Sequence, residues 1–408
     1  MRVNSPANDS VSRPGDRPVS AVAVPDHGSS VHDDVERGPS AWTPEAPPSI
    51  RAVQHAKGAD GVGHGAAVAL SATALAGCAL VPVAALVLPA DHALHLSDYA
   101  LTLSGKILCY CVAAVALGIV WGYCGILSLG HALFFALGGY AFGMYLMREA
   151  SGNGLPAFMS YLSWTELPWY WAGSDSIVWA IAMAMVVPGV VAFVFGYFAF
   201  RSRVKGVYLS IITQALTFAA MLLFFRNETG FGGNNGFTGF TTILGYPLAS
   251  SPTRVVLWLA SFLLLLAAIA ACRFLVGSRY GQVLTAIRDA ETRAMFVGYR
   301  PLGYKLSAWT FSAVLCGLAG ALYVPQVGII NPGEMAPVNS IEMAIWVAVG
   351  GRGTILGPVI GAIGVNGAKT FFTSTFADYW LLFLGAIFVL VPLLLPRGVI
   401  SLLHRRSS

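Results

Sequence analysis

The sequence predicts an all-α polytopic membrane protein with about ten transmembrane helices, one of them short or re-entrant, after a disordered N-terminal tail. Three observations lead to this fold class. Of the 408 residues, 56% are hydrophobic and only 11% are charged, whereas soluble domains average about 25% charged residues. The apolar residues fall in long blocks, each close to the roughly 20 residues that a helix needs to cross a bilayer. Residues 1–60 contain no such block.

The N-terminal tail is rich in Pro, Ser, Asp, Arg and Gly. A segment of this composition cannot bury enough apolar surface to offset the entropy lost on folding, so we expect residues 1–60 to be disordered. The tail is too polar for a signal peptide, which begins with a short basic region and an apolar stretch. We therefore expect one transmembrane permease domain over residues 61–408.

Ten apolar segments of this domain are candidate spans. The eighth is too short for an ordinary span, so it is a tilted helix, a half-helix or a re-entrant segment. The segments are 66–89, 99–121, 127–147, 176–200, 206–226, 254–275, 304–326, 339–350, 355–374 and 379–396.

Basic residues between the spans predict the orientation of the chain. They gather at 201–205, at 273–300 and at 397–406. Because cytoplasmic loops are enriched in Lys and Arg, we expect these three regions to face the cytoplasm, with both termini inside. This topology requires the eighth segment to cross, and it places loops 148–175 and 227–253 outside. The net charge of +5 is modest and lies in these loops, so it indicates no nucleic-acid partner.

The sequence shows no arrangement typical of a catalytic or metal site. The six cysteines lie in or beside apolar blocks without a CxxC or Cys/His spacing, and the histidines are scattered. The HExxH and GxSxG motifs of hydrolases are absent. No GxxxxGK[ST] occurs, so the chain has no P-loop to bind a nucleotide. We therefore expect no catalytic residues, no cofactor and no metal, and a role other than that of an enzyme.

The loop 277–303 contains an amphipathic segment. Apolar or small residues recur there at helical steps, at Val283, Leu284, Ile287, Ala290, Ala294 and Val297. The opposite face carries Arg288, Asp289, Glu291 and Arg293, and Gly298 follows where a helix is expected to end. A short charged helix at the membrane surface suits docking to a cytoplasmic partner. An ordinary surface helix that joins two spans fits the same pattern.

Several motifs resemble the branched-chain amino acid permease family of ABC importers. In the loop, the motif consists of Ala286, Ile287, Arg288 and Asp289, followed by Gly298 and the segment 304–307. Blocks 122–131 and 350–358 agree with it. Within the family, the chain is most similar to urea permease subunits, on blocks 208–214, 224–227, 230–236, 326–334 and 339–354. The resemblance covers about residues 95–400.

The resemblance implies a multi-pass subunit of the bacterial inner (plasma) membrane that forms the translocation path of an ATP-driven urea importer. It implies separate ATP-binding subunits, a second permease subunit in a heterodimer, and an extracytoplasmic solute-binding protein. A branched-chain amino acid is the alternative solute. A secondary transporter or a channel is a further alternative, which the charged loop 277–303 disfavours because such a protein needs no ATPase-docking loop.

Polar side chains within or beside the apolar spans are candidates for the solute path. Each costs free energy in lipid unless it faces the bundle or an aqueous path. Urea is flat and neutral, with one carbonyl acceptor and four N–H donors, so its path needs both donors and acceptors. The candidates are Gln214, Asn339, Glu342 and His131. The alternatives are structural: a packing role for His131, and an ion pair of Glu342 with Lys369.

Overall fold

The computed structural model describes residues 64–375, with gaps at 90–91, 93–94 and 153, and the short pieces 382, 385–386 and 398–400. The expected tail, residues 1–60, lies outside the described residues. So does nearly all of the tenth expected span, 379–396. The fold below is that of the described part.

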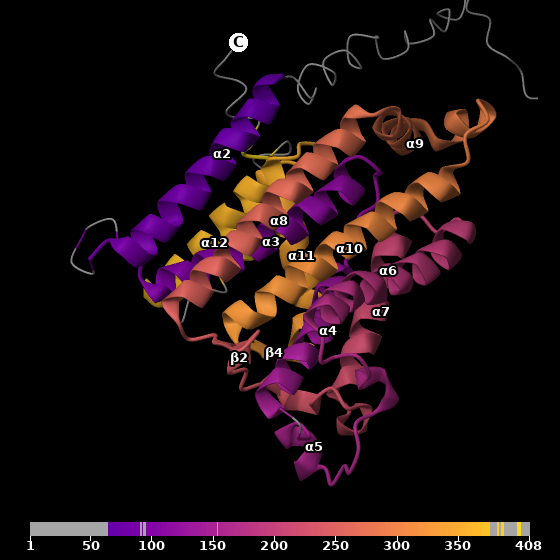
Figure 1. The fold of residues 1–408 in the computed structure, drawn as a ribbon. Coiled ribbons are helices and arrows are strands. Elements are labelled where there is room, and N and C mark those ends of the chain that lie inside the picture. The colour runs from indigo at the N-terminus through magenta and orange to yellow at the C-terminus, as the bar shows by residue number, and fades with distance from the viewer. Residues whose placement is uncertain are drawn as a thin grey trace, which may run out of the picture. The chain divides into compact units, whose positions relative to one another are not determined.

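This part is built from helices, with strands of only two residues each (Figure 1). The helices that correspond to the first nine expected spans are α2 (His64–Pro82, continued by the π-helix η1, Val83–Val87), α3 (Asp98–Gly122), α4 (His131–Ser151), α6 (Ile177–Arg201), α7 (Val207–Phe225), α8 (Ser251–Gly277), α10 (Pro301–Val327), α11 (Pro337–Gly350) and α12 (Gly357–Thr375). Among the described residues, α3, α6, α7, α8 and α10 are long and apolar enough to cross a membrane. The prediction of an all-α polytopic membrane protein is confirmed.

The connecting segments are short elements. They are α5 (Ala157–Tyr161), α9 (Arg279–Phe296), the 3-10 helices η2 (Trp169–Trp171), η3 (Asn227–Thr229), η4 (Gly233–Asn235) and η5 (Pro332–Met335), and the strands β1 (Phe237–Thr238), β2 (Thr242–Ile243), β3 (Tyr246–Pro247) and β4 (Ile329–Ile330). Strand β1 pairs antiparallel with β4, and β2 pairs antiparallel with β3.

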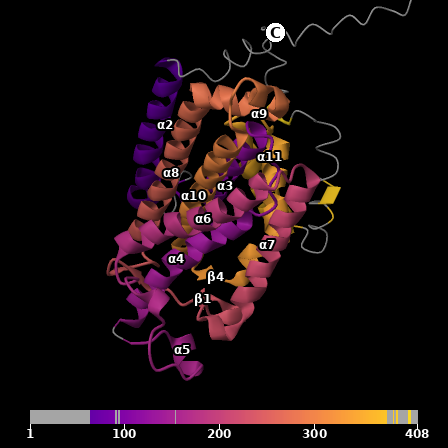
Figure 2. The same ribbon diagram turned by 90° about the vertical axis from the view of Figure 1, so that its right-hand side faces the viewer.

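Helix α10 forms the centre of the bundle and packs against α3, α4 and α6 (Figures 1 and 2). Glycines make this packing close. A side chain at Gly138 of α4 would overlap the backbone of Gly317 on α10, and one at Gly320 would overlap the backbone of Phe135 on α4. Small residues at helix contacts let backbones approach and gain van der Waals contact where lipid supplies no hydrophobic driving force.

The chain between α3 and α4 is not helical, so α4 begins at His131, four residues later than the expected span. Gly125 has a φ of +73°, which turns the backbone out of the helix. The freed backbone groups are satisfied by α7: the N–H of Leu129 donates to Thr213 Oγ1 at 3.1 Å, and Ser210 Oγ donates to the carbonyl of Leu127 at 2.8 Å. Such a break is tolerated at membrane depth because protein surrounds it.

A second break separates α10 from α11. Gly328 ends α10 with a φ of +79°, and β4 and η5 follow before α11 begins. With 14 residues, α11 is about 21 Å long, which is shorter than the roughly 30 Å of a bilayer core. Its far end lies beside the C-terminal end of α3, where Tyr123 Oη donates to the carbonyl of Gly353 at 3.0 Å. The segment is therefore a half-helix that still carries the chain to the other end of α3.

Candidate functional site

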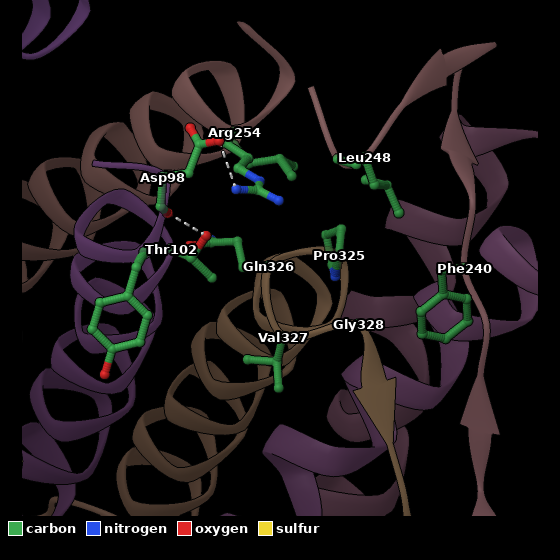
Figure 3. A pocket seen from close by; sticks show the side chains of 12 residues that line it. Asp98, Thr102, Phe240, Leu248, Arg254, Pro325, Gln326, Val327 and Gly328 are labelled. Carbon is green, nitrogen blue, oxygen red and sulfur yellow. Dashed lines mark hydrogen bonds and ion pairs between the residues drawn. The ribbon is translucent and has the colours of Figure 1, made fainter. Parts of the chain in front are cut away.

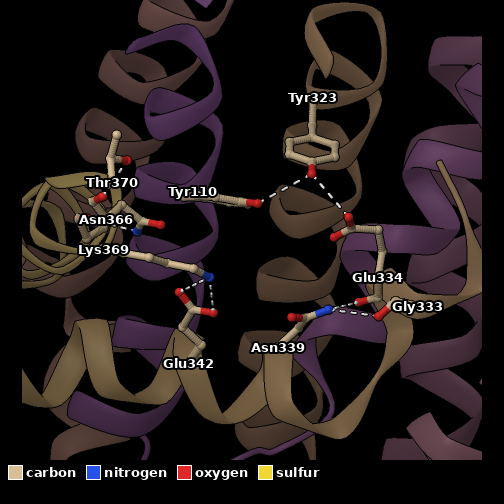
Figure 4. Close-up of polar contacts among 10 residues, drawn as sticks. Tyr110, Tyr323, Gly333, Glu334, Asn339, Glu342, Asn366, Lys369 and Thr370 are labelled. Atoms are coloured by element: carbon tan, nitrogen blue, oxygen red, sulfur yellow. Dashed lines mark hydrogen bonds and ion pairs between the residues drawn. The ribbon is translucent and has the colours of Figure 1, made fainter. Parts of the chain in front are cut away.

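Polar side chains from α3, α10, η5, α11 and α12 meet beside the break between α10 and α11 (Figure 4). They are linked by hydrogen bonds, by one ion pair and by cation–π contacts. We call this group the polar cluster, and it consists of Lys106, Tyr110, Tyr323, Glu334, Asn339, Glu342 and Lys369.

One half of the polar cluster is an ion pair between α11 and α12. Lys369 Nζ lies 3.0 and 2.9 Å from the two carboxylate oxygens of Glu342. The side chain of Glu342 is 10% exposed and that of Lys369 is 35% exposed. Removing either charge alone would leave the other poorly compensated away from bulk water. The structure thus contains the ion pair that the sequence left open for these two residues.

The other half is a chain of hydroxyl groups that ends on a carboxylate. Tyr110 Oη donates to Tyr323 Oη at 3.4 Å, and Tyr323 Oη donates to Glu334 Oε1 at 3.1 Å. Figure 4 shows Glu334 and the Glu342–Lys369 pair on opposite sides of the cluster, with Asn339 between them. The carboxylate of Glu334 receives no ion pair from the described residues.

Lys106 projects from α3 toward the two tyrosines. Its Nζ lies 5.7 Å from the ring centroid of Tyr110 and 5.9 Å from that of Tyr323, within the range of a cation–π contact. It also feels the charges of Glu334, Lys369 and Glu342. Within the described part of the chain, its ammonium group makes no hydrogen bond and no ion pair.

Aromatic rings surround these groups. The ring centroids of Tyr110 and Trp346 are 4.9 Å apart, and those of Phe135 and Tyr323 are 5.1 Å apart. Flat apolar faces beside charged groups can hold a planar solute and keep water away from it.

Asn339 holds the turn that presents Glu334. Its Nδ2 donates to the carbonyl of Gly333 at 2.9 Å and to the carbonyl of Glu334 at 3.2 Å. The side-chain oxygen of Asn339 accepts no hydrogen bond from the described residues, so it is an acceptor that remains open.

His131, another predicted path residue, lies in the core and not in the polar cluster. Its side chain is fully buried, with Nδ1 at 2.9 Å from Ser128 Oγ and Nε2 at 2.8 Å from Ser312 Oγ. Phe134 and Trp309 pack against its ring edge to face. Both ring nitrogens of His131 are therefore hydrogen-bonded within the bundle.

Gln214, the fourth predicted path residue, lies on α7. The helix turns Ser210, Thr213 and Thr217 into the bundle, whereas Gln214 is partly exposed. It forms no hydrogen bond with any described residue of the polar cluster.

Besides Lys369, which the sequence offered only as an ion-pair partner of Glu342, four residues of the polar cluster were not among the sequence candidates: Lys106, Tyr110, Tyr323 and Glu334. For two of these four, the sequence contains a feature that could have identified them. Lys106 is a charged residue inside the expected span 99–121, which is rare unless the residue is functional or paired. Glu334 ends the block 326–334, and only the fold shows that it turns back toward α3. Nothing in the local pattern separates Tyr110 and Tyr323 from ordinary core tyrosines.

The predicted loop helix is present as α9, which continues across a kink at Ala290 (φ −151°, ψ 70°). Leu284, Ile287 and Ala294 are buried, as the amphipathic pattern predicts. Ala286 is not among the buried residues of this helix. Gly298 ends the segment with a φ of +97°, which confirms the expected helix stop.

The side chain of Arg288 binds residues of its own chain. Its Nη1 donates to the carbonyl of Gly122, the last residue of α3, at 2.5 Å, and its Nε donates to Asp289 Oδ1 at 2.8 Å. The side chain thus joins α9 to the end of α3 and to the turn around Gly125, against which its methylene groups pack. Asp289 is 60% exposed and is available to a partner.

Glu291 provides a second attachment of α9. Its carboxylate lies 2.5 Å from Lys205 Nζ and 2.7 Å from Lys305 Nζ. Burial alone would raise the pKa of Glu291, but the hydrogen bonds and charges of the two lysines outweigh it, so the pKa lies below its ordinary value. The loop after α6 and the first turns of α10 are therefore bound to α9 through one carboxylate.

Beyond the kink, α9 exposes an apolar end. Phe296 is 87% exposed and Val297 is 77% exposed, with Met295 and Tyr299 partly exposed beside them. We call these residues the α9 apolar tip. Val297 was expected on the buried face, but it follows the end of the helix and so leaves that face.

A cavity of about 430 Å³ opens at the opposite end of α3, between α3, α8 and α10 (Figure 3). Asp98 and Arg254 form an ion pair of 3.0 Å at its edge, and Gln326 lines its wall. Gln326 packs against Gly105 and donates to Ser261 of α8. Thr102, another lining residue, precedes Lys106 on α3 by one helical turn. The cavity therefore lies toward the start of α3 from the polar cluster.

Comparisons with known proteins place the chain in a family. Residues 99–392 match the family described as branched-chain amino acid transport system / permease component. The high-affinity branched-chain amino acid transport system permease protein LivM of Escherichia coli is 25% identical over 342 residues, which cover 78% of this chain and 74% of LivM. LivM of Salmonella typhimurium is 25% identical over 315 residues, covering 72% of this chain and 68% of that protein. The probable branched-chain amino acid transport permease protein LivM of Methanocaldococcus jannaschii is 24% identical over 262 residues, covering 62% and 75%.

No solved structure matches the chain. The family match extends over most of the transmembrane helices described above and includes the polar cluster and α9. The chain therefore belongs to the branched-chain amino acid transport permease family, as a multi-pass inner-membrane transport subunit and not an enzyme.

Proposed function

We propose that this permease subunit works in an ATP-driven ABC importer, that the polar cluster lines its solute path, and that the solute is urea. The observation that carries the proposal is the meeting of two lysines, two glutamates and two tyrosine hydroxyls at the α10–α11 break. Charged groups within a membrane domain are costly and commonly mark a path for a polar solute.

The position of the polar cluster supports a path. Lys106 lies eight residues from the start of α3, or about 12 Å along the helix axis, so it is well within a membrane-spanning helix. The break beside it exposes backbone groups of η5, as do the broken helices that form the binding sites of membrane transporters. Asn339 and Glu342 belong to this path in our proposal, while Gln214 lies on the neighbouring helix α7, which contacts η5.

The choice of urea rests on where the urea-type sequence blocks lie in the fold. Blocks 326–334 and 339–354 form the end of α10, the turn η5 and the half-helix α11. These are the elements that carry Glu334, Asn339 and Glu342. Two of the five blocks that resemble urea permeases therefore lie at the polar cluster, where the solute would be recognised. Urea offers an acceptor and four N–H donors, which complement the ammonium, hydroxyl and carboxylate groups found there.

A branched-chain amino acid is the second candidate, favoured by the names of the LivM relatives. Its carboxylate would bind a lysine of the polar cluster and its ammonium group a glutamate. The aromatic rings around Tyr110 could then hold the aliphatic side chain.

ATP-binding subunits as partners are supported by the family match and by the exposed surface of α9. ATP-binding subunits would dock on the α9 apolar tip and on Asp289, and their movement would reach α3 through Arg288. We further expect a second permease subunit and an extracytoplasmic solute-binding protein. In this assembly, Ala286, Ile287, Arg288, Asp289 and Gly298 make up the coupling element.

Transport by the reconstituted complex tests the proposal. The full chain is assembled with its partner subunits in proteoliposomes, and ATP-dependent uptake of labelled urea and labelled leucine is measured in parallel. We expect uptake of urea. Uptake of leucine without urea would replace the solute but keep the importer, and uptake of neither in an active complex would overturn the assignment of both solutes.

A further inference from the structure

We propose that Lys106 and Glu334 form a solute-binding subsite, in which the Lys106 ammonium binds a carbonyl or carboxylate oxygen and the Glu334 carboxylate accepts hydrogen bonds from N–H groups. The subsite selects a small solute of zero net charge that carries an acceptor at one end and N–H donors at the other. This inference rests on the proposed function and adds the residues that hold the solute.

The first step is the contrast between two pairs of opposite charges in the same cluster. Glu342 and Lys369 bind each other directly through both carboxylate oxygens. Lys106 and Glu334 do not: in the described part of the chain the lysine makes no hydrogen bond, and the only side-chain hydrogen bond of Glu334 comes from Tyr323 Oη. A lysine ammonium has three donors and a carboxylate about four acceptor positions. Most of the hydrogen-bonding capacity of these two groups is therefore open.

The second step is that both groups face the same side chain. Tyr323 has its hydroxyl 3.1 Å from Glu334 Oε1 and its ring centroid 5.9 Å from Lys106 Nζ. The ammonium and the carboxylate thus lie along one tyrosine, and Tyr110 lies beside it with its own ring 5.7 Å from the same Nζ. A molecule that lay against these rings could reach both charged groups.

The third step is charge balance. Two lysines and two glutamates give the polar cluster no net formal charge, and the four groups influence one another electrostatically. A solute with net charge would upset this balance where water is scarce, which is costly. A neutral diamide such as urea, or a zwitterion, preserves it. Either one would also supply the partners that Lys106 and Glu334 lack within the described part of the chain.

The test uses the initial rate of uptake by the complete reconstituted transporter at solute concentrations well below saturation, normalised to the amount of inserted permease. Lys106→Gln and Glu334→Gln keep the side-chain polarity and remove one charge each. We expect each to lower urea uptake about tenfold, because a charge-assisted hydrogen bond is replaced by a weaker neutral one. The double variant is expected to lose less than the product of the two single losses, because the two residues bind one solute and the double change restores charge balance.

Controls separate a binding role from a folding role. Glu228→Gln changes a glutamate of the same kind in an exposed ion pair with Arg226, and we expect wild-type uptake. Lys106→Arg retains the charge and is expected to recover most of the activity. Co-purification of the partner subunits shows that each variant assembles.

The outcomes distinguish this inference from the proposed function. Wild-type protein that transports neither urea nor leucine overturns the proposed function. Wild-type protein that transports urea while both single variants match it overturns the subsite alone, as do losses that multiply in the double variant. If the wild type transports leucine and not urea, the subsite is retained only when both variants lower leucine uptake and the double variant abolishes it, since a zwitterion needs both charges.

Discussion

The two ends of the bundle use charge in opposite ways. At α9, three charged side chains are joined to protein partners: Arg288 binds Asp289 and the carbonyl of Gly122, and Glu291 binds Lys205 and Lys305. In the polar cluster, only the Glu342–Lys369 pair is closed, while the second lysine and glutamate are not bound to each other. A closed ion pair joins two elements of the protein, whereas a charged group with open hydrogen-bonding positions can bind a ligand. In our proposal, the end of the bundle at α9 is therefore the mechanical end, and the polar cluster is the binding end.

Breaking the closed pair of the polar cluster should have the largest effect. Glu342→Ala leaves Lys369 without its carboxylate between α11 and α12. Loss of one partner from a fully buried pair costs about 3–5 kcal/mol, and we expect a smaller loss, about 2 kcal/mol, because Lys369 is 35% exposed. Thermal unfolding of the detergent-solubilised protein measures this. The double variant Glu342→Gln with Lys369→Met is the control and should recover stability, and an unchanged unfolding temperature in Glu342→Ala would show that the pair contributes nothing.

Reversing a charge at the mechanical end should impair coupling with little loss of stability. Arg288→Glu removes the bond to the Gly122 carbonyl and repels Asp289, so we expect ATP-driven uptake to fall at least about tenfold. Asp289→Lys should lower uptake less, since this side chain is the more exposed of the two. Arg293→Glu on the same helix is the comparison, because no described residue binds Arg293. Equal losses at 288 and 293 would mean that surface charge matters and that the link to α3 does not.

Alanine substitutions of Asn339 and Gln214 should lower solute uptake by less than the changes above, and by different amounts. Asn339→Ala removes two hydrogen bonds that hold η5 against α11, each with a net value of about 0.5–1.5 kcal/mol. We expect a several-fold loss of uptake at normal expression. Gln214→Ala should have a weaker effect, because Gln214 makes no hydrogen bond with the described cluster. Full uptake in both variants across a range of solute concentrations would move the path away from α11 and α7.

The smallest expected effect is the dependence of the attachment of α9 on pH. The pKa of Glu291 is lowered by Lys205 and Lys305 despite its burial. A carboxyl group whose pKa is lower in the folded than in the unfolded state stabilises the fold at pH values above its unfolded-state pKa. This contribution is lost as the pH falls through the folded-state pKa. Attachment of α9 should therefore weaken below the ordinary glutamate pKa of 4.5. Limited proteolysis of the 277–303 loop at falling pH measures it, and Glu291→Gln should lack the transition. The same pH profile in both proteins would assign the change to another group.

The sequence predicted the helices well because apolar length and the absence of charge are local properties. The first nine expected spans have counterparts, and the short eighth one is the half-helix α11. The helical spacing of apolar residues in the loop 277–303 predicted helix α9, and the position of Gly298 after the last of them predicted the helix end. Asn339 and Glu342 were singled out as polar residues at the edge of a span, and both lie in the polar cluster. That they line a solute path stays a prediction.

What the sequence could not predict depends on contacts between distant segments. Tyr110 and Tyr323 are 213 positions apart, and only the packing of α3 on α10 brings their hydroxyls together. The inward turn of Arg288 depends on where α3 ends, at a break that glycines permit but do not dictate. His131 resembled a path residue because it is polar and intramembrane, and only the positions of Ser128 and Ser312 reveal a satisfied core histidine.

The pairing of β1 with β4 connects the loop after α7 directly to the segment that precedes η5. Phe237 and Thr238 belong to the loop that we expect outside, and they are paired with Ile330 and Ile329, immediately before the turn that carries Glu334. A protein that bound this loop and displaced it would pull on that turn directly, without any helix moving first. In the importer that we propose, a solute-binding protein docked on this loop would therefore act on the carboxylate of Glu334 through a two-residue ribbon, independently of the ATP-binding subunits at α9.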